Sequence, residues 1–393
     1  MKKILALVLA AVMALALVAC GAAPAETPAA APAEAPAAAP AEAPAAAPAD
    51  SGKPFEGHTL YVANWQDYMS DADYVEKAFE EKYGCEVEHV YYNSYEELMT
   101  TLQTGGNKTI DACVLSHNYT QWFHEAGLLK NVDPADIPNY AFVDPLYKDL
   151  APYAVDADGN VFAFPWLNGT SALFYNPELC PIEINHWSDL LKPEVKGHVM
   201  FLSGANDCWI VGCLLSGQDP DHIEDVDIDL VRESLMQLKE NMLGFWSSND
   251  EQLMPWYSGD FYAGELWSGP YCELLAKDPG TVKMVHPEEG TIAYVDYWSV
   301  VEGTDEYELA CLWIDFIESE EVQTTMGTGI SETYPGEYYT YPPVNANALK
   351  ALTPEQLIPL QLDPAPTCLK MLPYIADPDL KEQWDILTED FTG

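Results

Sequence analysis

The protein has 393 residues, with 63 Asp and Glu against 17 Lys and Arg, and its formal net charge is −46. Arg232 is the only arginine. A nucleic-acid-binding role is close to excluded, because phosphate contacts need clustered Lys and Arg side chains. Residues 1–53 hold only three lysines and four acids, so the negative charge belongs to 54–393. The whole chain has 48% apolar and 12% aromatic residues, which is ample for a core, and the length of 54–393 predicts two lobes.

The first 19 residues have the pattern of an export signal. Two lysines at 2 and 3 precede an apolar run over 4–18, which is too short to span a bilayer with margin. The run ends in Leu-Val-Ala-Cys, which resembles a bacterial lipobox. This resemblance implies that 1–19 is a lipoprotein signal peptide and that lipid on Cys20, the mature N-terminus, anchors the protein to the outer face of the cell membrane. The alternative is an ordinary secretory signal with an incidental cysteine.

A linker is predicted over 20–53, beginning with the lipidated cysteine. Residues 23–46 are three near-copies of an eight-residue repeat of Ala, Pro and Glu or Thr, from which no packed core can form. Alternating prolines favour polyproline II at about 3.1 Å per residue, so about 30 residues could hold the body up to roughly 90 Å from the membrane. We therefore interpret this segment as a spacer.

Strand and helix patterns alternate along the rest of the chain. The first part, read in order as strand, helix, strand, helix, strand and helix, predicts a mostly parallel sheet with helices on its faces. Later runs continue the α/β pattern, and one of them places Ile228, Val231, Leu235, Leu238 and Met242 on one helical face. The predicted strands are 58–64, 86–92, 110–115, 199–202 and 292–301. The predicted helices are 72–83, 95–102, a helix that ends near 127, 207–215, a helix that begins at 227, and 307–317. Thr304 and Asp305 are the capping candidates for the last of these helices.

Motifs for catalysis or cofactor binding are missing from the sequence. It has no His-Glu-x-x-His, Gly-x-Ser-x-Gly, P-loop or Gly-x-Gly-x-x-Gly pattern, so no cofactor is predicted. Residues 156–160 resemble a calcium loop with its glycine out of register, and a β-turn is favoured. His117 and His124 are seven residues apart, and solvated or core-edge positions are expected for them. The eight cysteines after Cys20 permit disulfides in an exported protein, but their irregular spacing and apolar surroundings fit buried thiols as well and do not predict a metal site.

Three segments resemble one protein family. Asn-Trp-Gln-Asp-Tyr at 64–68, the run from His186 to Gly197, and Tyr-Pro-Pro-Val-Asn at 341–345 are similar to segments of the bacterial spermidine and putrescine receptors of ABC transporters. The order and spacing of these segments hold from about 57 to 350. The resemblance implies an α/β type II periplasmic-binding-protein fold, in which two lobes with mixed or parallel sheets flanked by helices close by hinge bending. The implied lobes are 54–167 with 290–345 and 168–289 with 346–393, joined by strands near 164–170 and 286–293.

The same resemblance implies a ligand site. Carboxylates would offset the desolvation of ammonium groups, while aromatic faces would cover methylenes and add about 0.5 to 2 kcal/mol of cation–π attraction. Asp296 is the strongest candidate, because it lies inside an apolar strand pattern, where a charge is costly without a partner. Carried over residue by residue, the implied ligand-binding set is Trp65, Asp67, Tyr68, Ser116, Asp207, Trp267, Tyr294 and Asp296.

Four positions depart from the family pattern and bear on the ligand. Gly204 stands where spermidine receptors have an aspartate, and Pro270 stands where putrescine receptors have one. Tyr294 replaces a more usual tryptophan, and Asn118 replaces a tyrosine. The remaining carboxylates suit a putrescine-like diamine better than spermidine. The expected function is that of a lipid-anchored, monomeric substrate-binding protein that delivers a polyamine to a membrane permease and is not an enzyme. The alternatives are the same fold with another small cation or metabolite, a secreted hydrolase with paired carboxylates, and an acidic adhesin or scaffold.

Overall fold

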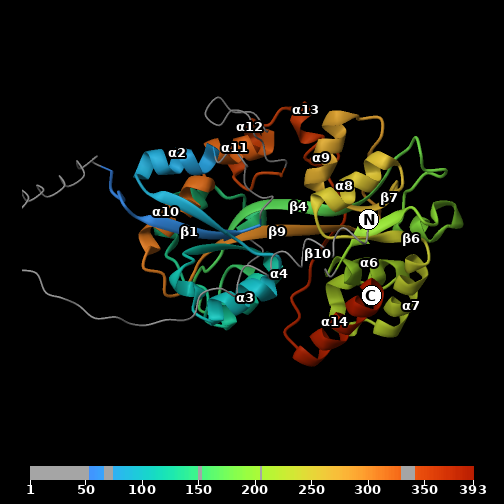
Figure 1. Ribbon diagram of the computed structural model, residues 1–393, viewed down its shortest axis with the longest axis horizontal. Coiled ribbons are helices and arrows are strands. Elements are labelled where there is room, and N and C mark those ends of the chain that lie inside the picture. Colours follow the sequence, from blue (N-terminus) through green and yellow to red (C-terminus); the bar gives the residue numbers. More distant parts are fainter. Residues whose placement is uncertain (1–52, 66–73, 149–152, 204–205, 329–340) are drawn as a thin grey trace, which may run out of the picture. The chain divides into compact units, whose positions relative to one another are not determined.

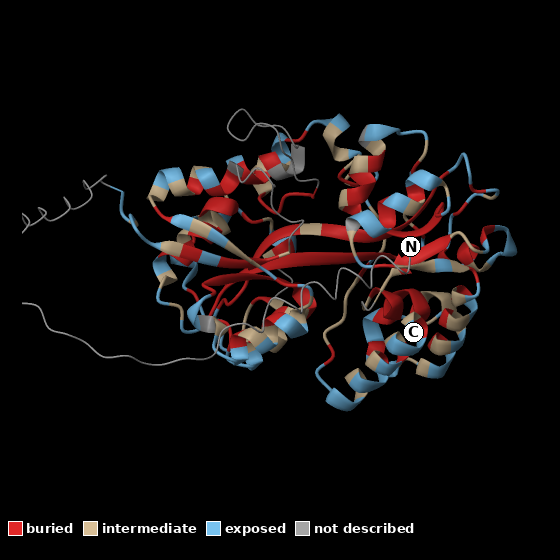
Figure 2. Ribbon diagram, viewed as in Figure 1, coloured by how far each residue is buried: buried red, intermediate tan, exposed pale blue. Residues whose placement is uncertain are grey.

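Two long buried strands, β4 (Phe164–Tyr175) and β9 (Thr291–Val300), lie side by side in the computed structural model of the protein (Figures 1 and 2). The structure describes residues 53–65, 74–148, 153–203, 206–328 and 341–393. The predicted signal peptide, Cys20 and the linker up to 52 lie outside the described residues, as do Asp67, Tyr68 and Gly204. Among the described helices, none combines the length and the apolar character that a membrane span needs.

The strands form one mixed sheet in the order β2-β1-β3-β9-β4-β7-β5-β6, with β10 beside β9 and β8 beside β4. Because β4 and β9 pair antiparallel with each other and each also pairs with further strands, hydrogen bonding is continuous along the sheet. The predicted connecting segments 164–170 and 286–293 fall in or next to these two strands. The other strands are β1 (Thr59–Asn64), β2 (Glu86–Tyr91), β3 (Ala112–Ser116), β5 (Val199–Leu202), β6 (Met242–Trp246), β7 (Ala263–Trp267), β8 (Lys283–Val285) and β10 (Leu369–Met371).

Helices follow the strands along most of the chain. The predicted α/β alternation of the first part is confirmed, because β1 pairs in parallel with β2 and β3, and a helix follows each of the three strands. Gly84, with φ +86°, ends the first of these helices, as the sequence predicts. The α-helices are α2 (Tyr74–Tyr83), α3 (Tyr95–Gln103), α4 (His117–Glu125), α5 (Pro145–Lys148), α6 (Asp207–Ser216), α7 (Ile228–Lys239), α8 (Asn249–Ser258), α9 (Ser268–Lys277), α10 (Tyr307–Ile317), α11 (Glu320–Thr328), α12 (Ala346–Ala351), α13 (Pro354–Leu357) and α14 (Pro378–Thr392).

Two local predictions differ from the structure. Met242 begins strand β6 and does not extend α7, because the chain turns at Asn241, whose side chain donates to the carbonyls of Leu190 and Lys192. Asp305 does not cap α10. Thr304 accepts a hydrogen bond from the Glu306 amide at 2.9 Å and thereby holds the turn before the helix.

Three smaller features of the sequence can be located in the structure. The turn predicted over 156–160 forms, with Gly159 N donating to Asp156 O at 3.0 Å. The eight cysteines that follow Cys20 are free thiols, and all except the half-buried Cys368 are buried. In the described part of the chain, no three His, Cys, Asp or Glu side chains are grouped closely enough to hold a metal ion.

His117 is buried in the core and is neither solvated nor at its edge, contrary to the expectation from the sequence. Its Nε2 lies 2.9 Å from Leu372 O, and its Nδ1 lies 3.4 Å from the amide nitrogen of Val295. A neutral ring with its proton on Nε2 satisfies both contacts, donating to Leu372 and accepting from Val295. Burial lowers the pKa of His117 to about 4.

This histidine predicts a dependence of stability on acid pH. The unfolded ring takes up a proton near its ordinary pKa of 6.5, whereas the folded ring does so only near 4. The contribution of His117 to the free energy of unfolding should therefore fall as the pH drops from about 6.5 towards 4. Urea denaturation at pH 7.0, 5.5 and 4.5 measures this slope, and the His117→Asn variant should show a shallower one. Equal slopes in the two proteins would contradict the assignment.

Candidate functional site

Asp296 lies where three strands meet. It is 1% exposed in the middle of β9, where the register places it opposite Ser116 of β3 and Leu167 of β4. Ser116 immediately precedes α4, and its buried hydroxyl makes no hydrogen bond with a described residue. Strand pairing thus brings together two of the predicted site residues, one an acid and the other a hydroxyl that is still able to bind a ligand.

Aromatic side chains join this pair to the end of β1. The indole Nε1 of Trp65 donates to the hydroxyl of Tyr95 at 3.3 Å, and that hydroxyl also accepts from Ser116 N at 3.0 Å. The Trp65 ring meets Tyr92 and Tyr95 edge-on, at centroid distances of 4.7 and 5.3 Å. Burial and the charge of Asp296 raise the pKa of Tyr95 well above its ordinary value. Sequence reasoning missed Tyr95, although it begins a helix after a parallel strand, where ligand groups often lie.

Tyr294 lies two residues before Asp296 on β9 and therefore on the same face of the sheet. It is paired with Gly169 of β4, and a Cβ atom at Gly169 would come within 2.4 Å of the Tyr294 hydroxyl and 2.8 Å of Ser268 Oγ. The glycine therefore lets the tyrosine hydroxyl lie directly against β4. Burial raises the pKa of Tyr294 well above its ordinary value, and nearby Tyr341 and Asp296 add to the shift.

Asp207 begins α6 and lies against Glu265 of β7, a residue that the sequence analysis did not select. The two side chains are 4% and 0% exposed. Leu202 N donates to Glu265 Oε2 at 3.1 Å, whereas Oε1 receives no hydrogen bond from a described residue. Burial raises the pKa of Asp207. Burial, the charge of Asp207 and a hydrogen bond between the two carboxyl groups raise the pKa of Glu265 well above its ordinary value. The two acids therefore form one buried carboxyl pair.

Trp267 follows Glu265 by two residues on β7 and is partly buried. Its ring packs edge-on against Trp246 at 4.8 Å. The register pairs it with Ser171 of β4, whose hydroxyl favours the ionised forms of both Asp207 and Glu265. Trp267 therefore adjoins the carboxyl pair.

Gln361 is a further residue beside the site that sequence reasoning missed. It is 6% exposed, and its Oε1 accepts a hydrogen bond from Thr170, which is paired with Ala293 next to Tyr294. Its Nε2 makes no hydrogen bond with a described residue. The sequence holds no signal for this glutamine, because it lies beyond the segments that resemble the receptors.

The segment from Tyr341 to Asn345, the third part of the resemblance, also packs against β4. Asn168 Nδ2 donates to Pro342 O at 3.0 Å, and the Asn345 side chain accepts from two amides at the start of α12. Of the departures from the family pattern, Asn118 is buried in α4 and Pro270 is buried in α9. Neither supplies a charge.

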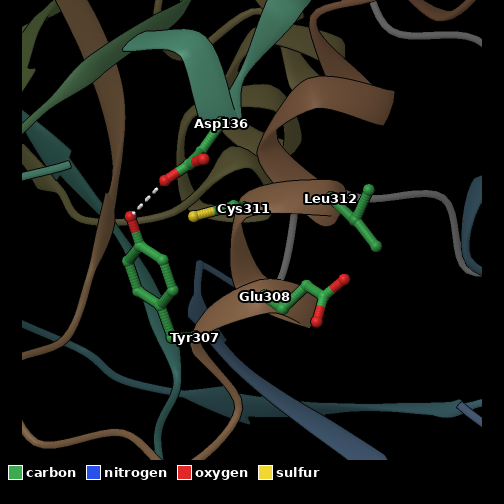
Figure 3. A pocket seen from close by; sticks show the side chains of 5 residues that line it. All are labelled: Asp136, Tyr307, Glu308, Cys311 and Leu312. Carbon is green, nitrogen blue, oxygen red and sulfur yellow. Dashed lines mark hydrogen bonds between the residues drawn. The ribbon is translucent and has the colours of Figure 1, made fainter. Parts of the chain in front are cut away.

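A separate hollow lies beside α10 (Figure 3). The Tyr307 hydroxyl donates to Asp136 Oδ2 at 2.7 Å, so two of the polar groups that line the hollow are already hydrogen-bonded to each other. Burial raises the pKa of Cys311 to about 11, which keeps it a neutral thiol. None of the predicted site residues is among its lining residues, which are Asp136, Tyr307, Glu308, Cys311 and Leu312.

Comparison with known proteins assigns the chain to a family. The family model of bacterial extracellular solute-binding proteins matches residues 75–352. The chain is 26% identical over 304 residues to the spermidine/putrescine-binding periplasmic protein of Escherichia coli, covering 76% of this chain and 81% of that one, and 25% identical over 317 residues to the putrescine-binding periplasmic protein PotF of the same organism, covering 76% and 80%.

A solved structure shows the same fold. The substrate-binding protein PotD of the spermidine/putrescine ABC transporter from Streptococcus pneumoniae matches with a TM-score of 0.66 and 20% identity, over 85% of this chain and 98% of that one. The fold is thus the α/β, two-lobed periplasmic-binding-protein fold that the sequence predicts. The family is one of transport proteins that act outside the cytoplasm, and it is not an enzyme class. The chain belongs to the bacterial extracellular solute-binding proteins.

Proposed function

We propose that the protein captures a polyamine, with a putrescine-like diamine favoured over spermidine, and delivers it to the permease of an ABC importer. The observation that carries this proposal is the pair of separate acidic positions, Asp296 and the Asp207–Glu265 pair, with Tyr294 near both. The charges of both Asp296 and Asp207 raise the pKa of Tyr294, so this buried aromatic residue has both acids in its neighbourhood. A diamine carries two ammonium groups on an apolar stem, which matches two acidic positions with an aromatic side chain near both.

Further residues belong to the proposed binding set beside these acids and Tyr294. Trp65 and Trp267 would cover the methylenes, and Ser116 would accept a hydrogen bond from one ammonium group. Asp67 and Tyr68, which are outside the described residues, belong to the proposed set through the resemblance alone. Putrescine has six non-hydrogen atoms, and at about 1.5 kcal/mol each the binding free energy could reach roughly 9 kcal/mol, a sub-micromolar affinity.

We further propose that the site lies between two lobes, 54–167 with 290–345 and 168–289 with 346–393. The apolar cores support this division. The clusters that contain Trp313 and Phe123 draw almost entirely on the first set of residues, and those that contain Trp187, Trp384 and Trp256 draw almost entirely on the second. Helix α12 packs against α11, so the start of the last segment also adjoins the first set. Closure of the two lobes over the ligand would exclude water from the ammonium contacts.

A calorimetric titration tests the ligand. Purified protein is titrated with putrescine, cadaverine, spermidine, spermine, lysine and glycine betaine. We expect saturable binding of one putrescine or cadaverine per chain, and weaker binding of spermine. Binding of lysine or glycine betaine alone would favour the alternative of another small cation. The absence of heat from any polyamine, with a cooperative melt that shows folded protein, would refute the proposed function.

The membrane anchor is proposed from the sequence alone. We expect the Cys20→Ala variant to be lost from the membrane fraction when it is expressed in a bacterium. The variant lacks the residue that would carry the lipid, and this lipid is the proposed attachment to the membrane. Detergent phase partitioning of the two proteins measures this. Cys368→Ala is the matched control, since Cys368 is the only half-buried thiol among the described cysteines, and this variant should partition as the wild type does. A Cys20→Ala variant that stays with the membrane would contradict lipid anchoring at this residue.

A further inference from the structure

We propose that Glu265 and Asp207 together form the subsite for one ammonium group of the ligand, and that this carboxyl pair releases a proton to solvent when the ammonium group binds. The inference rests on the proposed function and deepens it. It adds Glu265, which the family resemblance does not include, and it couples ligand binding to a proton.

Burial and chain position define the subsite. Asp207 projects from the first turn of α6 and Glu265 from β7, and both side chains are almost completely buried. The Leu202 amide satisfies one oxygen of Glu265, whereas Oε1 has no donor among the described residues. A buried carboxylate oxygen without a donor is costly, so the pair requires either a proton, held in the hydrogen bond between Asp207 and Glu265, or a cation.

Ser171 gives a second, independent sign of a ligand. Its hydroxyl is 1% exposed and lies close enough to both carboxyl groups to lower their pKa values. It nevertheless makes no hydrogen bond of ordinary geometry with a described residue. A hydroxyl and a carboxylate oxygen that are both buried and incompletely satisfied can each accept a hydrogen bond from an ammonium group, which has three donors.

The described groups around the pair supply no cation. No lysine, arginine or histidine of the described residues is among the groups that shift the pKa of either acid. The other titratable groups that sense the pair are Cys208 of α6, whose pKa burial raises to about 12, Tyr119 of α4 and Tyr294 of β9. All three are neutral at physiological pH. Two like charges in one buried site cannot both be held at low cost, so the unliganded pair retains one proton.

Ligand binding then exchanges one positive charge for another. The pair with its proton carries one negative charge, the ammonium group enters, and the proton leaves to solvent, so that two carboxylates face one ammonium group. No covalent bond between heavy atoms changes. The arrangement also explains how the chain functions with Gly204 and Pro270 at positions where related receptors have an aspartate, because β7 supplies the additional carboxylate.

Calorimetry in two buffers tests the proton directly. Putrescine is titrated at pH 6.0 in phosphate and in bis-Tris, which differ in ionisation enthalpy, so the difference in observed heat gives the number of protons released. At this pH ordinary carboxyl groups are already ionised. We expect at least about half a proton released per bound diamine. If putrescine binds with equal heat in the two buffers, the inference fails while the proposed function stands, whereas a failure of all polyamines to bind refutes the proposed function itself.

A variant assigns the proton to the pair. Glu265→Gln keeps the shape and the acceptor for Leu202 N but cannot titrate. We expect its proton release to fall close to zero and its dissociation constant to rise by about ten- to a hundredfold, as for the loss of one charged hydrogen-bond partner. Glu233→Gln, on the exposed side of α7, is the matched control and should behave as the wild type. Unchanged proton release in Glu265→Gln would overturn the assignment.

Stability without ligand provides a second measurement that does not depend on binding. Since the folded pKa values of the pair are raised, the pair favours the folded state less as the pH rises above the ordinary carboxyl pKa. As the pH rises from 5 to 8, the melting temperature of the unliganded wild type should therefore fall relative to that of Glu265→Gln. An equal change in the two proteins would show that the pair holds no proton.

Discussion

Replacement of Asp296 by alanine is expected to weaken diamine binding by about thirtyfold or more. Asp296 is 1% exposed at the junction of β3, β9 and β4, next to Ser116. An ammonium group bound in this place loses its anionic partner in the variant and stays desolvated. Truncation of one member of a buried charge pair costs about 2 to 5 kcal/mol, which corresponds to roughly thirty- to several-thousandfold in affinity.

Tryptophan fluorescence can follow this loss, because Trp65 adjoins Ser116 through Tyr95. Asp296→Asn is the sharper variant, since it removes the charge but keeps the shape of the side chain. Asp158→Asn, in an exposed turn, is the matched control and should bind as the wild type does. A folded Asp296→Asn protein with the dissociation constant of the wild type would remove Asp296 from the site.

The second large effect concerns the fold. Gly264→Ala should lower the free energy of unfolding by about 3 kcal/mol or more. Gly264 has φ +149°, and a Cβ atom there would come within 2.3 Å of Met200 O and 3.1 Å of Met200 N. These are backbone atoms of the neighbouring strand β5, so the clash cannot be relieved unless the two strands separate.

Gly244, in the strand β6 on the other side of β5, provides the control for this prediction. A Cβ atom at Gly244 of β6 would meet nothing within 4 Å, so Gly244→Ala should cost less than about 1 kcal/mol. Urea denaturation of the two variants measures the difference. Equal stabilities would show that β5 and β7 do not approach each other as closely as described. Because Glu265 follows Gly264 directly, any Gly264→Ala protein that folds should also bind the ligand less tightly.

The sequence predicts the parts of the fold that carry local patterns. The strands β1 and β3 and the helices α3, α6 and α10 have clear apolar periodicity, and their predicted bounds lie close to the observed ones. Strand β7 was missed because it is only five residues long and contains a glycine, which weakens the strand signal. Met242 continues the apolar spacing of α7, but tertiary contacts of Asn241 end the helix first.

The site could be predicted only in part. Asp296 was selected because it is an acid within an apolar strand, and the same reasoning applied to Phe261–Leu266 identifies Glu265. Tyr95 and Gln361 could not be found in this way, because an aromatic residue at the start of a helix resembles a core residue, and a glutamine in a loop resembles a solvated one. Strand register decides that Ser116 lies opposite Asp296, and no local pattern specifies register between segments so far apart in the chain.

A crystal structure of the protein with putrescine tests the central claim most directly. We expect one ammonium group within hydrogen-bond distance of the Asp296 carboxylate and the other within hydrogen-bond distance of Asp207 or Glu265, with the apolar stem against Tyr294. A diamine bound elsewhere at saturating concentration, in contact with neither Asp296 nor the carboxyl pair, would contradict the proposed site.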